Sequence, residues 1–123
     1  MKGWIGIDLD GVLAHYDGWK GVEHIGDPIP AMLERVFEWI QQGQPLKIFT
    51  ARVYCGESGE DPVGDRYRDA QIARTVIEKW SLKNIGVILP VTCCKDTSMI
   101  TLWDDRCVRV KTNTGEPCCA LST

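Results

Sequence analysis

The sequence predicts an α/β fold, a three-layer sandwich around a mainly parallel sheet, in one domain over residues 1–123. A chain of 123 residues suits one compact domain and is too short for two. Short apolar runs alternate with longer segments of helical periodicity, in the order strand, helix, strand, helix, strand. This order is typical of right-handed crossovers, which leave successive strands parallel.

The strands are predicted from short runs rich in Ile and Val that glycine or proline bounds. They are expected at residues 2–9, 45–50, 86–91 and 99–103, with a last short edge strand at 107–111. The segments 14–28 and 53–64 are rich in glycine and proline and lack periodicity, so we expect a small flap and a loop there.

Two helices are predicted from apolar stripes of helical spacing. The first begins at Pro30, which suits a first helical turn, and ends near Gly43. Its stripe is Met32, Leu33, Val36, Phe37 and Ile40. The second helix begins near residue 65, and its stripe is Ile72, Ala73, Val76, Ile77 and Trp80.

The composition is that of an ordinary globular domain, with 44% hydrophobic and 25% charged residues. Fourteen basic and seventeen acidic residues give a net charge of −3, which does not indicate a surface for nucleic acid or anionic membranes. No apolar run reaches the ~20 residues of a membrane helix, and no secretory signal precedes the first strand. We therefore expect a cytoplasmic protein with no membrane partner. Its six cysteines, without metal-site spacing, are expected to be reduced.

Polar side chains gather where the predicted strands end, although buried strands normally exclude aspartate. These residues are Asp8 and Asp10 after the first strand, Thr50 after the second, Asp104 and Asp105 after the fourth, and Lys95 between the third and fourth. In parallel sheets the carboxyl ends of the strands line the ligand crevice. We therefore expect these residues to converge at one edge of the sheet.

The same motifs resemble, in order, the four motifs of the haloacid-dehalogenase superfamily. They read Asp8-Leu-Asp-Gly-Val-Leu, Ile-Phe-Thr50-Ala-Arg, Lys95, and Leu-Trp-Asp104-Asp105-Arg, and the resemblance covers residues 5–106. It implies a Rossmann-like hydrolase domain. Since only about forty residues separate Asp10 from Thr50, the cap would be minimal or absent. Dehalogenases of this superfamily lack the second aspartate of the first motif, so Asp10 favours phosphate chemistry.

By this resemblance the chain is expected to be a Mg²⁺-dependent phosphatase that forms an aspartyl-phosphate. Asp8 would be the nucleophile and Asp10 the general acid and base. The Mg²⁺ ligands would be Asp8, the backbone carbonyl of Asp10, Asp104 and, directly or through water, Asp105.

The phosphoryl group would meet Gly11, where the backbone turns sharply, and the donors Thr50 and Lys95. Lys83 also precedes a predicted strand, so it is an alternative to Lys95 as the phosphate-binding lysine.

The loop after Thr50 suggests a substrate class. Arg52, the run Glu57-Ser-Gly-Glu-Asp-Pro62 and Tyr67 are similar to the phosphatase domain of phage polynucleotide kinases. Arg52, Arg66 and Arg68 could bind a second phosphate or a nucleotide. The substrate is then a small-molecule or nucleotide phosphate, or a polynucleotide 3′-phosphate. The same loop is equally expected to be solvated surface, and Trp19 in the flap could stack on a base or simply cover the site.

Other interpretations remain open at this point. A receiver-like signalling module also uses an acidic cluster, Thr, Lys and an aspartyl-phosphate, although its motifs come in a different order. A non-catalytic binding protein on the same fold is a third. An uncovered sheet face would make a homodimer contact possible.

Overall fold

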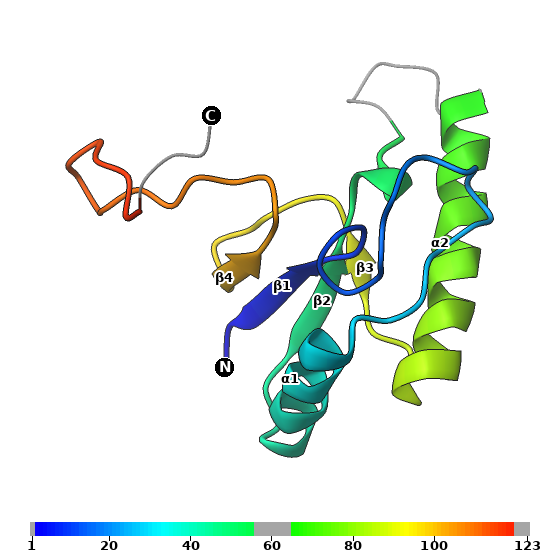
Figure 1. Ribbon diagram of the computed structural model, residues 1–123, viewed down its shortest axis with the longest axis horizontal. Coiled ribbons are helices and arrows are strands. Elements are labelled where there is room, and N and C mark those ends of the chain that lie inside the picture. The colour runs from blue at the N-terminus through cyan, green and yellow to red at the C-terminus, as the bar shows by residue number, and fades with distance from the viewer. Residues whose placement is uncertain (1, 56–64, 120–123) are drawn as a thin grey trace.

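A computed structural model of the chain describes residues 2–55 and 65–119 (Figure 1). The elements follow in the order β1 (Trp4–Asp8), α1 (Pro30–Gln41), β2 (Leu46–Phe49), the 3₁₀ helix η1 (Ala51–Val53), α2 (Asp65–Ile85), β3 (Val91–Thr92) and β4 (Met99–Trp103). Neither α-helix, as far as it is described, combines the length and the apolar character that crossing a membrane requires.

The four strands form one sheet in the order β3-β2-β1-β4, and every neighbouring pair is parallel. This arrangement confirms the predicted α/β fold class with a Rossmann-like parallel sheet. The register aligns the ends of three strands: Asp8 pairs with Phe49 of β2, and Ile7 pairs with Trp103 of β4. The residues just after β2 and β4 therefore lie level with the end of β1.

Both α-helices pack against one face of this sheet. Ile5 and Ile7, which share a face because side chains alternate along a strand, belong to one buried cluster with Val36 of α1 and Ile77 of α2. The opposite face carries no helix in the described residues, so the described elements form two layers where the sequence predicted three. There the indole of Trp4 donates to Asp96 at 2.8 Å.

The ends of α1 agree with the sequence prediction, whereas its buried face is narrower than predicted. Pro30 occupies the first turn, and Gly43 has a φ of +74° just after the helix. The N–H of Gly43 donates to Ile40 O, and that of Gln44 donates to Trp39 O, which closes the helix end. Phe37 and Ile40, predicted in the apolar stripe, are exposed, whereas Met32 and Val36 are buried and Leu33 packs partly against the core.

The strand predicted at 86–91 is wrong over most of its length, because β3 contains only Val91 and Thr92. The apolar run before it is satisfied in another way. The buried hydroxyl of Ser81 donates to Val87 O at 2.7 Å and accepts from the N–H of Leu89 at 3.1 Å. A helix side chain thus supplies the hydrogen bonds that a strand would have taken from its neighbour.

The predicted edge strand at 107–111 is also wrong, because these residues do not join the sheet. They form one side of a small arm that leaves the end of β4 (Figure 1). Lys111 N donates to Glu116 O at 2.8 Å, and Cys118 N donates to Arg109 O at 2.7 Å. Val108 and Val110 are exposed on this arm. The predicted homodimer contact stays a prediction.

Candidate active site

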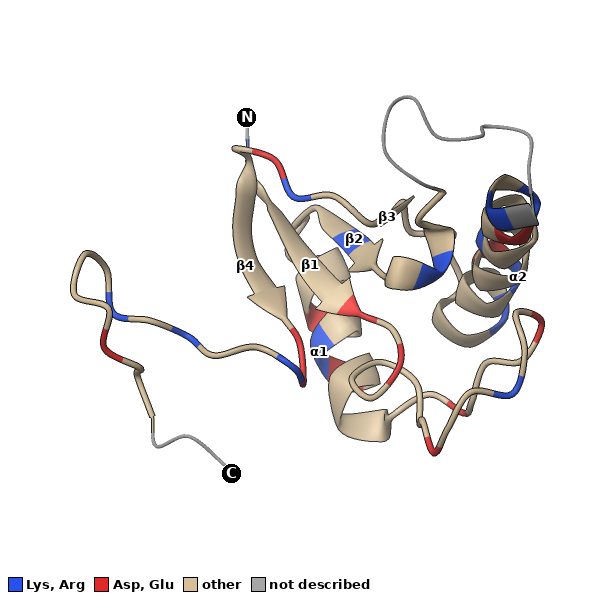
Figure 2. Cartoon of the chain, turned by 90° about the horizontal axis from the view of Figure 1, so that it is seen from above, with Lys and Arg blue, Asp and Glu red and all other residues tan. Residues whose placement is uncertain are grey.

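Three carboxylates meet where β1 and β4 end. Asp8, Asp104 and Asp105 each offer an oxygen, and these oxygens lie within 4.8 Å of one another. Figure 2 shows acidic positions in red directly after the ends of β1 and β4. The parallel register explains this closeness, since the pairing of Ile7 with Trp103 brings Asp8 level with Asp104. The cluster contains only oxygen ligands, the type that Mg²⁺ prefers.

The electrostatics of the cluster act most strongly on Asp8. Burial is the largest cause that raises the pKa of Asp8, from 3.8 to about 7, followed by the charge of Asp104 and then by a hydrogen bond to Asp105 and its charge. A hydrogen bond from the N–H of Leu9 to Asp8 Oδ1, at 3.0 Å, acts in the opposite direction. Without a cation, Asp8 is therefore protonated in part of the molecules near neutral pH.

A tight turn after β1 brings Gly11 against Asp105. The N–H of Gly11 donates to Ala14 O at 2.8 Å, and Gly11 has a φ of +88°, a conformation that favours glycine. A Cβ at this position would collide with Asp105 Oδ2. The structure thus gives a steric reason for the glycine that follows the two aspartates.

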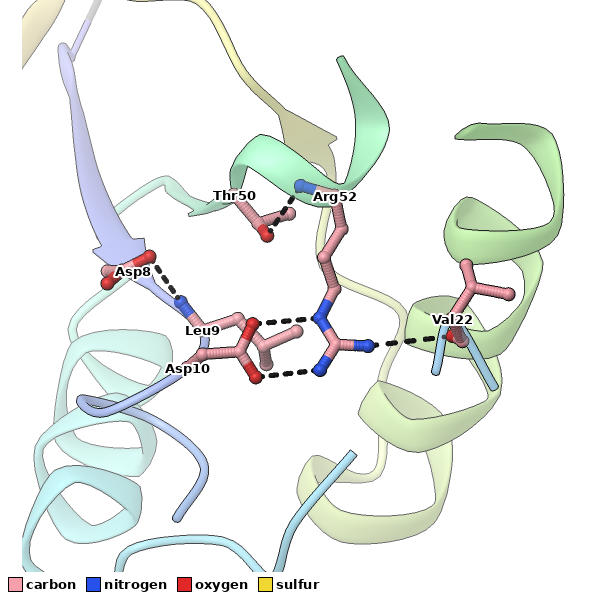
Figure 3. A network of polar contacts seen from close by, with 6 residues as sticks. All are labelled: Asp8, Leu9, Asp10, Val22, Thr50 and Arg52. Atoms are coloured by element: carbon pink, nitrogen blue, oxygen red, sulfur yellow. Dashed lines mark hydrogen bonds and ion pairs between the residues drawn. The ribbon is translucent and has the colours of Figure 1, made fainter. Parts of the chain in front are cut away.

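Asp10 points away from the acidic cluster and is paired with Arg52 (Figure 3). Arg52 Nε donates to Asp10 Oδ2 and Arg52 Nη2 donates to Asp10 Oδ1, both at 2.8 Å. The Arg52 side chain is only 6% exposed, so this bidentate ion pair is largely shielded from water. Arg52 was predicted to bind substrate, whereas here it binds a residue of the first motif. The ligand role predicted for the Asp10 carbonyl stays a prediction.

Thr50 lies buried between β2 and η1. Its N–H donates to Thr92 O at 2.9 Å, which continues the pairing of β2 with β3. Its hydroxyl accepts from the N–H of Arg52 at 3.2 Å, a side-chain cap that starts the 3₁₀ helix (Figure 3). The same hydroxyl can still donate its hydrogen to a ligand.

The flap over residues 14–28 is anchored at both ends. His15 N donates to Asp27 O at 2.8 Å, and Gly26 is so close to the carbonyl of His15 that a Cβ would collide with it. The indole of Trp80 on α2 donates to Gly26 O at 3.0 Å. Val22 packs on the core. The flap is therefore a braced loop, and His15 and His24 on it are exposed.

A cavity of about 400 Å³ joins these parts, and we call it the strand-end cavity. Its lining consists of Asp8, Asp10, Tyr16, Trp19, Thr50, Ala51, Arg52, Asp105 and Arg106. Sequence reasoning did not assign Tyr16 or Arg106 to the site. Arg106 directly follows the last acidic pair, and this position was a signal that could have identified it. Tyr16 has no such signal, because only the folded flap brings it to the strand ends.

The other predicted site residues lie elsewhere. Lys95 lines a second cavity, of about 500 Å³, which we call the edge cavity; its other lining residues are Met99, Ile100, Thr101, Leu102, Trp103, Cys107 and Arg109. Lys83 lies in the last turn of α2 and lines neither cavity.

The two arginines predicted to bind substrate lie on the first turns of α2, outside the strand-end cavity. The guanidinium of Arg66 lies over the ring of Tyr54, with Cζ 5.3 Å from its centroid, and Arg68 is exposed. Of the loop predicted at 53–64, Val53 is buried in the core at the end of η1. The run 57–62, similar to polynucleotide phosphatases, lies outside the described residues.

No protein-family model, curated protein or solved structure matches this chain. The resemblance to the haloacid-dehalogenase superfamily therefore depends on the motifs alone.

Proposed function

We propose that the chain is a divalent-cation-dependent phosphatase that hydrolyses a phosphomonoester through an aspartyl-phosphate on Asp8. The observation that carries this proposal is the meeting of Asp8, Asp104 and Asp105 within 4.8 Å, beside a cavity that Asp8, Asp105, Thr50 and two arginines line. Three carboxylates repel one another at this distance unless a proton or a cation lies among them.

The donor set fits Mg²⁺. All three groups are carboxylates, Asp8 and Asp104 are partly buried, and Asp105 is exposed enough to reach the ion directly or through water. Burial and then the neighbouring acids raise the pKa of Asp8, because both make its charged form unfavourable until a cation compensates. Mg²⁺ held by Asp8, Asp104 and Asp105 would reduce the repulsion between these carboxylates and an incoming phosphate.

The reaction has two steps on the protein side. One oxygen of Asp8 attacks phosphorus and the bond from phosphorus to the leaving oxygen breaks, which gives an aspartyl-phosphate and an alcohol after the leaving oxygen takes a proton. A water molecule then attacks phosphorus, the bond to Asp8 breaks, and inorganic phosphate is released. Both steps need a group that gives and then takes a proton.

Asp10 is proposed for this proton transfer, and its pairing with Arg52 sets a condition on it. Both oxygens of Asp10 accept from the guanidinium at 2.8 Å, so neither can give a proton to a leaving oxygen in this arrangement. The Asp10 side chain must rotate out of the ion pair when substrate is bound. A phosphate that competes for Arg52 would release it.

The charge on the transferred group is proposed to be stabilised by Thr50 and Arg106. The Thr50 hydroxyl keeps one hydrogen to donate, and Arg106 lines the same cavity from the β4 side. Arg106 thus takes the role that the sequence resemblance implied for Lys95, which lines the edge cavity.

Hydrolysis of para-nitrophenyl phosphate with and without Mg²⁺ tests the proposal. We expect turnover that a chelator abolishes, and Asp8→Asn should lower kcat by about a thousandfold or more, because the nucleophile itself is lost. Asp27→Asn, the same substitution at an exposed acid outside the cavity, is the matched control and should keep full activity. Metal-independent turnover that survives Asp8→Asn would falsify the proposal.

A further inference from the structure

We propose that Tyr16 and Trp19 form an aromatic wall that binds the base of a nucleoside phosphate, either a free nucleotide or the end of an oligonucleotide. This inference rests on the proposed phosphatase function and names its substrate class. The aromatic rings of Tyr16 and Trp19 line the strand-end cavity, and both residues belong to the flap. The acidic lining residues come from other segments: β1, the turn after it and the segment after β4.

The tip of the flap presents Trp19 to solvent and does not bury it. Trp19 is 60% exposed and Tyr16 is 45% exposed, although both are large rings that normally gain from burial. Gly18 and Gly21, on either side of Trp19, have φ values of +128° and +103°. Lys20 and Asp17 form an ion pair at 2.9 Å across this tip. The tip is thus a defined turn that leaves the indole of Trp19 exposed to solvent.

Arg52 fixes where the indole lies relative to the reacting groups. Its Cζ is 4.9 Å from the centroid of the Trp19 ring, while its nitrogens bind Asp10 at 2.8 Å. The Arg52 guanidinium therefore separates the Trp19 ring from the Asp10 carboxylate. The shielded guanidinium also holds the Trp19 ring by a cation–π contact, so this ring is placed before any ligand binds.

The separation between the Trp19 ring and Asp10 favours some aromatic phosphate esters over others. In an aryl phosphate the ring is bonded to the ester oxygen, so it would lie beside Asp10 and short of the wall. In a nucleoside phosphate the sugar separates the base from the phosphate, and the base can reach the wall while phosphorus faces Asp8. The cavity of about 400 Å³ is within the roughly 300–1,000 Å³ of small-molecule sites.

Calorimetric binding to the Asp8→Asn protein with Mg²⁺ tests the wall independently of turnover. The probes are adenosine monophosphate, ribose phosphate, which lacks the base, and a short oligothymidine with a terminal 3′-phosphate. We expect adenosine monophosphate to bind at least about tenfold more tightly than ribose phosphate, because stacking of a base on aromatic rings contributes about 1–3 kcal/mol. The oligonucleotide arm separates a free nucleotide from a chain end as the source of the base.

Trp19→Ala should remove most of the tenfold preference and leave the affinity for ribose phosphate unchanged, whereas Trp19→Phe should keep it. Tyr16→Ala should weaken the preference in the same direction. Phe37→Ala, at an exposed ring on α1 outside the cavity, is the control and should change nothing.

Equal affinity for adenosine monophosphate and ribose phosphate in the Asp8→Asn protein overturns the proposed aromatic wall, even before Trp19 or Tyr16 is changed. Loss of affinity for both probes in Trp19→Ala, with a folded Trp19→Phe protein that shows no preference, overturns it as well. A protein that turns over para-nitrophenyl phosphate but shows no preference contradicts only the wall. A protein that binds adenosine monophosphate more tightly than ribose phosphate but hydrolyses no phosphate ester contradicts only the proposed phosphatase activity.

Discussion

The strand-end cavity and the edge cavity are similar in size, about 400 and 500 Å³, but they differ in what surrounds them. The first lies where β1, β2 and β4 end, so residues from separate motifs meet in it. The second lies along β4 itself, so consecutive residues of one strand line most of it. Side chains gathered from several strand ends can hold one ligand from several sides, whereas a single strand offers only one wall. This difference favours the strand-end cavity as the functional one.

The largest expected contrast is between two aspartates that flank β4. Asp104 follows the strand and belongs to the acidic cluster, whereas Asp96 precedes it and accepts from Trp4 and from Ser98 N at 2.8 Å. We expect Asp104→Asn to lower kcat/KM by about a hundredfold or more and to weaken Mg²⁺ binding in calorimetry. Asp96→Asn should lower Tm and leave activity intact. Equal loss of activity in both variants would contradict a specific role for the acidic cluster.

A second contrast is between two glycines with positive φ. Gly11 has a φ of +88° and faces Asp105, whereas Gly86 has a φ of +94° and open space around it. Both alanine variants should lose stability, by about 1 kcal/mol, because of the backbone conformation. Only Gly11→Ala should also displace Asp105, and displacement of a reacting group by about 1 Å can cost a hundredfold in rate. Thermal unfolding and turnover separate the two effects, and an active Gly11→Ala enzyme would contradict the close approach.

A third contrast is between Arg106 and Lys95, the two basic residues that are candidates for binding the phosphoryl group. Arg106 lines the strand-end cavity and Lys95 the edge cavity. We expect Arg106→Gln to lower kcat/KM about tenfold, since one charge-assisted contact to the phosphoryl group is lost, and Lys95→Gln to stay within about twofold. Steady-state kinetics with the two variants side by side gives the answer. The reverse ranking would restore the role that the sequence resemblance implied for Lys95.

The smallest effect concerns pH. Folded Asp8 keeps its proton up to about pH 7, whereas its ordinary pKa is 3.8, so between these values the folded chain binds more protons than the unfolded chain. The stability of the metal-free protein should therefore fall as the pH rises through this window, and Mg²⁺ should restore it mainly at the upper end. Asp8→Asn should remove the slope, which urea unfolding at several pH values measures. A wild-type slope of the opposite sign would contradict the clustered acids.

Much of the fold followed from the sequence, because the alternation of strand runs and helical stripes depends on local periodicity. The strand predictions were wrong where the local sequence pattern is that of a strand but the backbone finds its hydrogen-bond partners outside the sheet. The run 86–90 has strand composition, yet Ser81 satisfies its backbone groups from a helix. Residues 107–111 alternate like an edge strand, yet the chain turns away from β4 and pairs with 116–118. Nothing in the local sequence signals either partner.

The candidate site shows the same division. The convergence of Asp8, Thr50 and the last acidic pair follows from parallel topology, and the sequence order was sufficient to expect it. The partners of Asp10 and Trp19 depend on how the flap folds back over η1, which no periodicity specifies. Arg52 joins Asp10 to the flap, a contact that the sequence did not indicate, and its predicted role in binding substrate stays a prediction.

Covalent trapping of the phosphoryl group tests the central claim most directly. The Asp10→Asn protein is mixed with Mg²⁺ and para-nitrophenyl phosphate, whose leaving group departs without a proton from Asp10, and is quenched in acid. Its second step should be slow, so the intermediate should accumulate. Peptide mass spectrometry should then find one phosphoryl group on Asp8, and none in a protein that also carries Asp8→Asn. Rapid phosphate release with Asp8 unmodified, or a phosphoryl group on another residue, would contradict the account.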